Sequence, residues 1–300
     1  MSDIRIGMVG LDTSHCEAFV SVLNYEDNPH FVGGARVVGA YPGGSELCAV
    51  SRDRVEGFTQ TIRDKHGIAI CDTIEGLGED MDAFLLHSVD GRQHLEQFRV
   101  LAQFGKPVFM DKPLACSFAD AKQIGEIAAR GNVPVMSASS IRFSAGVTNL
   151  AAPGDEVGSC EAFGTMPILD DYPTYFWYGV HGADLLFSYM GRGCRTVQAV
   201  HSEDMDLLVG VWEDGRVGTV RGTRFSDYHF GCTLFCKSGT VHGRAADEPP
   251  AHAIMLKDII RFFQSGASSI PIEETLEVMA FLDAAGQSLA AGGKRVPLPR

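Results

Sequence analysis

Two short segments of the chain contain residue types suited to proton transfer and to polarising an oxygen atom. Lys112 stands between Asp111 and Pro113, so its ammonium group is held rigidly and is suited to polarise a hydroxyl or carbonyl group. His181 precedes Asp184 by three residues, which places both side chains on one face of a helix. There the imidazole is suited to accept a proton near pH 7, and the carboxylate would fix the tautomer of the imidazole. An exposed ion pair explains Lys112 equally well, and a satisfied core histidine is the commoner interpretation of His181.

The turn after the first apolar run begins at Gly10 and is a candidate phosphate site. A dinucleotide fingerprint has glycine at the first, third and sixth positions, but here Asp12 and His15 occupy the last two. The carboxylate of Asp12 would repel a pyrophosphate. The N–H groups at the start of the next helix, with the hydroxyls of Thr13 and Ser14, still suit a phosphate. A well-capped helix explains the same residues and is, from the motif alone, slightly the better interpretation.

The turn after the second apolar run is Gly43-Gly44-Ser45. It lacks the acidic residue that binds the ribose hydroxyls in NAD enzymes. Its small residues leave room for a 2′-phosphate within reach of Arg52 or Arg54, although an exposed turn is the better explanation. The choice between NAD and NADP therefore stays open at this point.

These segments follow the ends of predicted strands. Up to about residue 140, short apolar runs alternate with helical patterns, which is typical of βαβ units and a mainly parallel sheet. The predicted strands are 4–9, 36–40, 69–70, 82–86, 107–110 and 133–137. Later segments are strand-like with a turn at 213–215, which indicates an antiparallel meander with helices near 181–189, 253–263 and 273–290. Ligands of parallel sheets bind at the carboxyl ends of the strands, where the candidate residues lie.

The composition limits the classes of protein to consider. A chain of 300 residues with a net charge of −13 and 45% hydrophobic residues is typical of a compact soluble protein of about two domains. The acidic balance argues against a nucleic-acid or anionic-membrane partner. The eight cysteines form no CxxC pair and are predicted to be reduced thiols, and no metal site is predicted. Because the first residues lack the apolar stretch of a signal peptide, a cytoplasmic location is the default expectation.

Several of these segments occur in the order found in one known family. The run 82–86, then His94, then the run 105–115 with Asp111-Lys112-Pro113, resembles the signature of the glucose-fructose oxidoreductase/inositol dehydrogenase/MocA-type (Gfo/Idh/MocA) oxidoreductases. Arg142-Phe143, the Gly-x-His-x-x-Asp segment 179–184 and the ending 262–299 are similar to later parts of that family. The resemblance covers essentially the whole chain.

The resemblance implies an α/β protein with a Rossmann domain at 1–140. An α/β domain at 141–300 follows, whose open, mainly antiparallel sheet carries substrate and oligomer contacts, as in a homodimer or homotetramer. It also implies a bound NAD or NADP, with NAD preferred, and a sugar-like or polyol substrate. Lys112 would orient the reacting hydroxyl, His181 would remove its proton, and Asp184 would support the site. The expected cofactor-binding residues are Gly10, Asp12, Thr13, Ser14, His15, Ser45, Ser88, His94, Asp111 and Lys112.

One departure from the family pattern falls beside the expected base. Trp177 stands four residues before His181, where the family has an aspartate, and an indole offers only an N–H donor. Asp171, Tyr175 and Tyr178 are candidates to replace that carboxylate. Two further hypotheses therefore accompany the oxidoreductase: a family member that cleaves or eliminates from glycosides with its cofactor bound, and a catalytically silent ligand-binding or regulatory protein.

Overall fold

The computed structural model describes residues 3–78, 80–225 and 229–299, and the chain forms two compact units. The first comprises Met1–Ala138 with His252–Ile272, and the second comprises Ser139–Ala251 with Glu273–Arg300. The sequence predicts one boundary, near residue 140. In the structure a later segment, which contains most of α7 (Ala251–Ser265), also belongs to the first unit. The ring of His252 stacks on that of Phe19, with the centroids 6.2 Å apart.

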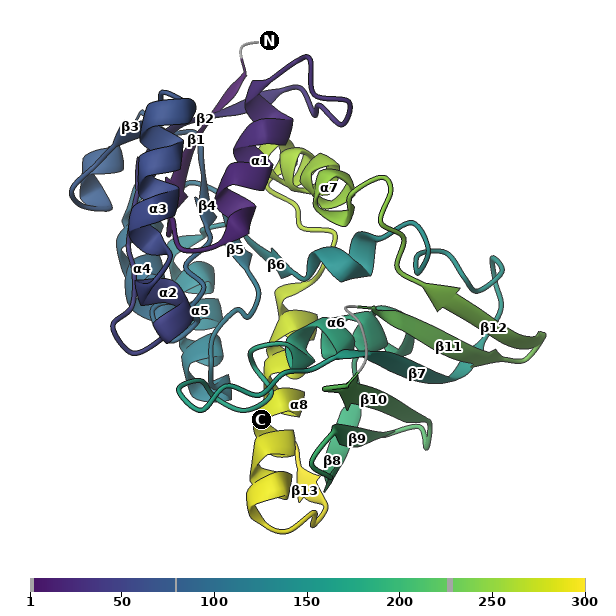
Figure 1. The fold of residues 1–300 in the computed structure, drawn as a ribbon. Coiled ribbons are helices and arrows are strands. Elements are labelled where there is room, and N and C mark those ends of the chain that lie inside the picture. The colour runs from purple at the N-terminus through teal and green to yellow at the C-terminus, as the bar shows by residue number, and fades with distance from the viewer. Residues whose placement is uncertain (1–2, 79, 226–228, 300) are drawn as a thin grey trace. The chain divides into compact units, whose positions relative to one another are not determined.

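The first unit is built on a six-stranded parallel sheet of order β3-β2-β1-β4-β5-β6 (Figure 1). Its strands are β1 (Ile4–Val9), β2 (Ala35–Tyr41), β3 (Ala69–Ile70), β4 (Ala83–Leu86), β5 (Val108–Asp111) and β6 (Val135–Ala138). The last three are buried at every residue, as expected for strands covered on both faces. This order confirms the predicted doubly wound sheet, with a topological switch point between β1 and β4.

Helices connect these strands and begin close to where the sequence predicts. They are α1 (Ser14–Asn24), α2 (Ala49–Arg52), α3 (Val55–Gln60), α4 (His94–Leu101) and α5 (Phe118–Gly131). Thr13 caps α1, and its side-chain oxygen accepts from the His15 N–H. The segment between β2 and β3 contains α2, α3 and a π-helical turn at Thr61–Lys65. Ser51 lies inside α2, where its hydroxyl is bonded to other loops instead of capping a helix.

The second unit is built on a seven-stranded sheet of order β12-β11-β7-β10-β9-β8-β13. Its strands are β7 (Val157–Thr165), β8 (Cys194–His201), β9 (Met205–Trp212), β10 (Val217–Thr223), β11 (Gly231–Cys236), β12 (Gly239–Arg244) and β13 (Val296–Pro297). Neighbouring strands are antiparallel except β7 and β10. The sheet therefore confirms the expected open, mainly antiparallel arrangement.

Two helices cover one face of this sheet. α6 (Gly179–Met190) packs on β7 and β10, and a Cβ at Gly182 would come within 2.6 Å of Val220, so glycine permits the close approach. α8 (Ile272–Ala290) places the ring of Phe281 against that of Phe187. Within the ranges that the structure describes, no helix is both long and apolar enough to cross a membrane.

Candidate active site

The turn between β1 and α1 is closed by contacts inside the first unit. Gly10 has a φ of +91°, and a Cβ there would lie 2.2 Å from the backbone nitrogen of Ser88, so the position requires glycine. The fully buried carboxylate of Asp12 accepts from the Val89 N–H at 2.9 Å and from the Ser51 hydroxyl at 2.6 Å. Burial raises the pKa of Asp12 although these hydrogen bonds oppose the shift. Its carboxylate is therefore bonded inside the protein and does not extend from the turn.

Three buried polar atoms gather beside this turn without partners. Ser88 Oγ, Gln93 Oε1 and Gln97 Oε1 make no hydrogen bond within the described ranges. Gly43 lies among them, because a Cβ built there would be 3.5 Å from both the Gly10 Cα and Ser88 Oγ, and 3.6 Å from the Gln97 amide nitrogen. A buried polar atom without a partner costs about 1–3 kcal/mol. The hydroxyl can donate to a phosphate, and the two amide oxygens can accept from ribose hydroxyls. These residues therefore fit the cofactor that the fold implies.

Two of the expected cofactor residues hold loops of the protein together. The Ser45 hydroxyl donates to Asp90 Oδ2 at 2.6 Å, and Arg92 Nε donates to the same carboxylate at 2.8 Å. Burial favours a raised pKa for Asp90, but the bonds from Arg92 and Ser45 outweigh it and lower that pKa. Nε2 of the buried His94 lies 2.7 Å from the Ser88 carbonyl oxygen. These side chains position the loops after β2 and β4 around the unpartnered atoms.

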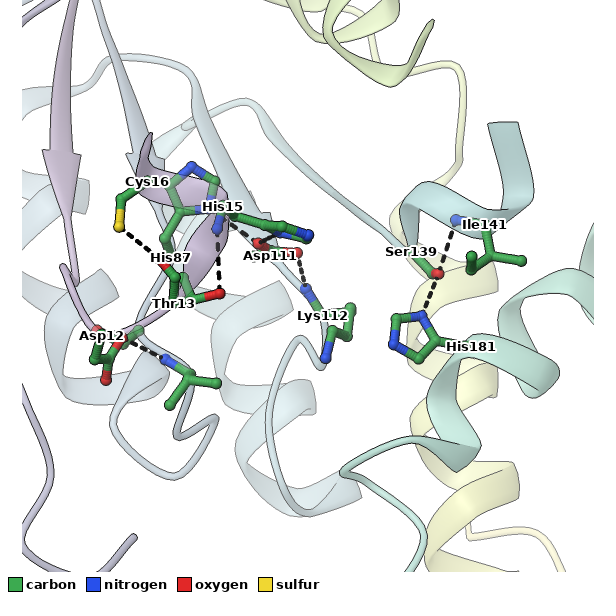
Figure 2. Close-up of polar contacts among 12 residues, drawn as sticks. Asp12, Thr13, His15, Cys16, His87, Asp111, Lys112, Ser139, Ile141 and His181 are labelled. Carbon is green, nitrogen blue, oxygen red and sulfur yellow. Dashed lines mark hydrogen bonds and ion pairs between the residues drawn. The ribbon is translucent and has the colours of Figure 1, made fainter. Parts of the chain in front are cut away.

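The last residue of β5, Asp111, and the next residue, Lys112, bring an anion and a cation to the same edge of the sheet (Figure 2). Asp111 Oδ2 lies 2.5 Å from His15 Nδ1 and 3.0 Å from His87 Nδ1, and its other oxygen accepts from the Lys112 N–H at 2.9 Å. Burial opposes ionisation of Asp111, but both imidazoles outweigh it and hold its pKa well below the ordinary value. Burial lowers the pKa of Lys112, with the charge of Asp111 opposing the shift. The sequence interpretation missed His87, although it directly follows β4.

The second unit surrounds His181 with a polar network. The Ser139 hydroxyl oxygen lies 2.6 Å from His181 Nδ1 (Figure 2). The Ser139 N–H donates to Asp184 at 2.9 Å. Arg142 donates to Asp184 at 2.9 Å and to Glu274 at 2.6 Å. Burial raises the pKa of Asp184, with the Arg142 charge opposing the shift. Ser139, which the sequence analysis did not select, thus contacts both the imidazole of His181 and the carboxylate of Asp184.

Aromatic rings border the same imidazole. The Tyr178 ring meets that of His181 edge to face, with centroids 5.1 Å apart, and Trp177 lies next to Tyr178. Tyr175, a candidate for the missing carboxylate's role, donates its hydroxyl to Asp206 at 3.2 Å. The Ser139 hydroxyl lies on Nδ1 of the imidazole, whereas the Tyr175 hydroxyl is bonded to Asp206.

A parallel doubly wound sheet with a glycine turn at its switch point defines a nucleotide-binding α/β class. Residues 4–139 match the model of the oxidoreductase family with an NAD-binding Rossmann fold, Gfo/Idh/MocA. Residues 4–139 are thus similar to this family, which confirms over this segment the resemblance seen in the sequence. No curated protein matches the chain by sequence.

Solved structures agree with this fold over the full length. GenD2 from gentamicin A biosynthesis, in complex with NAD, is 14% identical with a TM-score of 0.77 and covers 100% of this chain and 97% of its own. The WlbA dehydrogenase from Bordetella pertussis, in complex with NADH and UDP-GlcNAcA, is 18% identical with a TM-score of 0.76, covering 100% of both chains. Myo-inositol dehydrogenase from Lactobacillus casei, in complex with NAD(H) and myo-inositol, is 14% identical with a TM-score of 0.76, covering 100% and 98%.

Proposed function

We propose that this protein transfers hydride between a nicotinamide cofactor and a hydroxyl-bearing carbon of a sugar-like or polyol substrate, using His181 as base and Lys112 as the orienting cation. The observation that carries the proposal is the 2.6 Å contact between the Ser139 hydroxyl and His181 Nδ1. An imidazole anchored at one nitrogen directs the other toward a reacting group. The substrate class follows the inositol and UDP-sugar ligands of the similar structures.

The residues that would hold the cofactor lie at the carboxyl edge of the parallel sheet. The turn at Gly10, the hydroxyls of Thr13 and Ser14 at the start of α1, and the unpartnered hydroxyl of Ser88 suit its phosphates and ribose. Arg52, a candidate partner for a 2′-phosphate, donates to Asp53 at 3.2 Å instead, which favours NAD over NADP. When bound, the nicotinamide accepts or supplies the hydride.

His181 and Ser139 move the substrate proton in this proposal. The Ser139 oxygen already accepts from the Ile141 N–H at 3.2 Å, and its second lone pair accepts from Nδ1–H of the imidazole. That arrangement gives Nε2 the lone pair that takes the hydroxyl proton during oxidation, and Nε2–H returns it during reduction. Asp184, held by Arg142, fixes the position of the Ser139 backbone.

Lys112 stabilises charge on the substrate oxygen. Its ammonium group follows β5, where the backbone N–H is tied to Asp111 at 2.9 Å. As His181 removes the hydroxyl proton, negative charge develops on the oxygen, and a fixed cation lowers the free energy of that state. Burial lowers the pKa of Lys112, so the charge on this ammonium is more sensitive to its surroundings than that of an exposed lysine.

The test combines cofactor binding with turnover. Purified protein is titrated with NAD and with NADP, and a panel of polyols, inositols and nucleotide sugars is assayed by the absorbance of the reduced cofactor. We expect tighter binding of NAD, turnover of a polyol, and a loss of kcat/KM of about 100-fold or more in Lys112→Ala and His181→Ala. Lys106→Ala is the matched control, because Lys106 precedes β5 whereas Lys112 follows it. This variant should behave as the unaltered protein.

Other outcomes distinguish the remaining hypotheses. Cofactor binding without net reduction, together with release of product from a glycoside, would support the cleaving or eliminating type of enzyme. Absence of binding of either dinucleotide at millimolar concentration would overturn both enzymatic hypotheses and favour a ligand-binding or regulatory protein.

A further inference from the structure

Two imidazoles and one carboxylate converge in the first unit: His15 from the first turn of α1, His87 from the end of β4 and Asp111 from the end of β5. One ligand atom of each lies within 4.8 Å of the others. Figure 2 shows both imidazoles beside the Asp111 carboxylate, whose Oδ2 is 2.5 Å from one Nδ1 and 3.0 Å from the other. We call these three residues the His15–His87–Asp111 cluster.

Hydrogen bonds inside the protein do not complete this cluster. The side chain of His87 is fully buried, one nitrogen faces Asp111, and Nε2 has no hydrogen-bond partner in the described part of the chain. A neutral imidazole has one donor and one acceptor, and buried polar atoms are nearly always paired. The buried Nε2 is thus a second observation, separate from the close approach, and it shows that the hydrogen bonding of His87 is incomplete in the described residues.

The surroundings of the cluster suit a cation. A carboxylate and neutral imidazoles are the forms that ligate metal ions. The Phe19 ring packs on both imidazoles, whereas the His15 side chain is 22% exposed. One side of the cluster is therefore apolar, and the other is open to entry of an ion and to water.

We propose that the His15–His87–Asp111 cluster binds one divalent transition-metal ion of the Zn²⁺, Fe²⁺ or Co²⁺ class. Imidazole and carboxylate ligands suit these ions, whereas Mg²⁺ and Ca²⁺ prefer oxygen ligands alone. Bonds of about 2.0–2.2 Å require the ligand atoms to surround the ion, so rotation of these side chains moves the two Nδ1 atoms away from Asp111 Oδ2 to admit it. Three protein ligands leave a position for water or for an oxygen atom of a bound molecule. The inference does not rest on the proposed function, since metal binding is measured without nucleotide or substrate.

The second unit offers a matched comparison. His201 Nδ1 lies 2.7 Å from Asp206, the same kind of contact as in the cluster, but the third group there is the Arg224 guanidinium, which donates to Asp206 at 2.6 Å. A fixed positive charge takes the place of the second imidazole and repels a cation. This pair should therefore bind no metal, and His201→Gln is the control for loss of a histidine.

The experiment uses the full chain, freed of metal with a chelator, and Co²⁺ alone as the probe. Visible absorption follows ligand-field bands of the bound ion, and equilibrium dialysis with elemental analysis gives the stoichiometry. We expect one Co²⁺ per chain, displaced by Zn²⁺, and an affinity lowered at least tenfold in His15→Gln and in His87→Gln. His201→Gln should bind as the unaltered protein does.

The controls make each outcome decisive. Circular dichroism verifies the fold of every variant, and His15→Gln, which changes a partly exposed side chain, decides the question if the buried His87→Gln does not fold. The proposal is overturned if folded unaltered protein binds neither Co²⁺ nor Zn²⁺ at submillimolar concentration. It is equally overturned if folded His15→Gln keeps the full affinity, or if His201→Gln loses as much affinity as His15→Gln.

Discussion

The hydroxyl oxygen of Ser139 lies 2.6 Å from Nδ1 of His181, and the backbone N–H of the same serine donates to Asp184 at 2.9 Å. One residue thus connects the imidazole with the carboxylate that follows it on α6. In the proposed mechanism the Ser139 oxygen accepts from the N–H of the imidazole, a role that the indole N–H of Trp177 cannot take.

Replacing Ser139 should therefore affect turnover more than binding. Ser139→Ala removes the oxygen that orients His181, and we expect kcat to fall about tenfold with little change in KM. Ser139→Thr keeps the hydroxyl and should restore most of the rate. Nitrogen NMR of the histidine ring should show a mixed tautomer in the alanine variant. Ser188→Ala, on the same helix as His181, removes a hydroxyl that donates to the Leu185 carbonyl and serves as control; equal rates in both alanine variants would contradict the role.

The Arg142 guanidinium should be important for the stability of the second unit. Arg142→Met leaves the carboxylates of Asp184 and Glu274 buried without their cation, and we expect a loss of about 3 kcal/mol in the free energy of unfolding. Urea denaturation measures the change. The exposed pair of Arg195 with Glu213 provides the comparison, because Arg195→Met should cost about 1 kcal/mol or less. Similar losses in both variants would refute the importance of the buried network.

The glycine at the β1–α1 turn should not tolerate a side chain. Gly10→Ala adds a Cβ that would meet the Ser88 nitrogen at 2.2 Å at a φ of +91°, so we expect destabilisation of more than about 3 kcal/mol. Gly105 also has a positive φ, of +64°, but an added Cβ there would meet no atom of the described residues within 4 Å, and Gly105→Ala should cost about 1 kcal/mol. Thermal melts of the two variants test the difference, and equal melting temperatures would mean that the turn is loosely packed.

The contribution of Asp90 to the stability of the folded protein should decrease as the pH falls. Bonds from Arg92 and Ser45 lower its pKa in the folded protein despite burial, so its stabilising effect is present above the unfolded value of about 3.9 and is lost as pH falls through the folded pKa. We expect Asp90→Asn to be less stable by about 2 kcal/mol at pH 7, with the gap narrowing below about pH 4. Asp53→Asn, at an exposed pair, should change little at either pH. A gap that widens in acid would show that the sign is wrong.

The sequence by itself determined most helices and strands, and it showed which candidate catalytic residues lie at their ends. Alternating apolar runs and helical patterns predict the parallel sheet because side-chain spacing reports local backbone geometry. Lys112 was found because it stands between a strand end and a proline, and His181 because it lies one helical turn before Asp184. Glycine at position 10 was recognised from the turn, although the reason, contact with the Ser88 backbone, was not.

Only the tertiary structure decided which side chains meet. Arg142 and Glu274 are separated by 132 positions, and the pairing depends on the docking of α8, which no local spacing encodes. The inward direction of Asp12 depends on Ser51 and Val89 from two other loops. His15, His87 and Asp111 converge because β1, β4 and β5 are neighbours in the sheet. Strand order and helix docking are set by burial of apolar surface over the whole unit, and local sequence patterns do not contain that information.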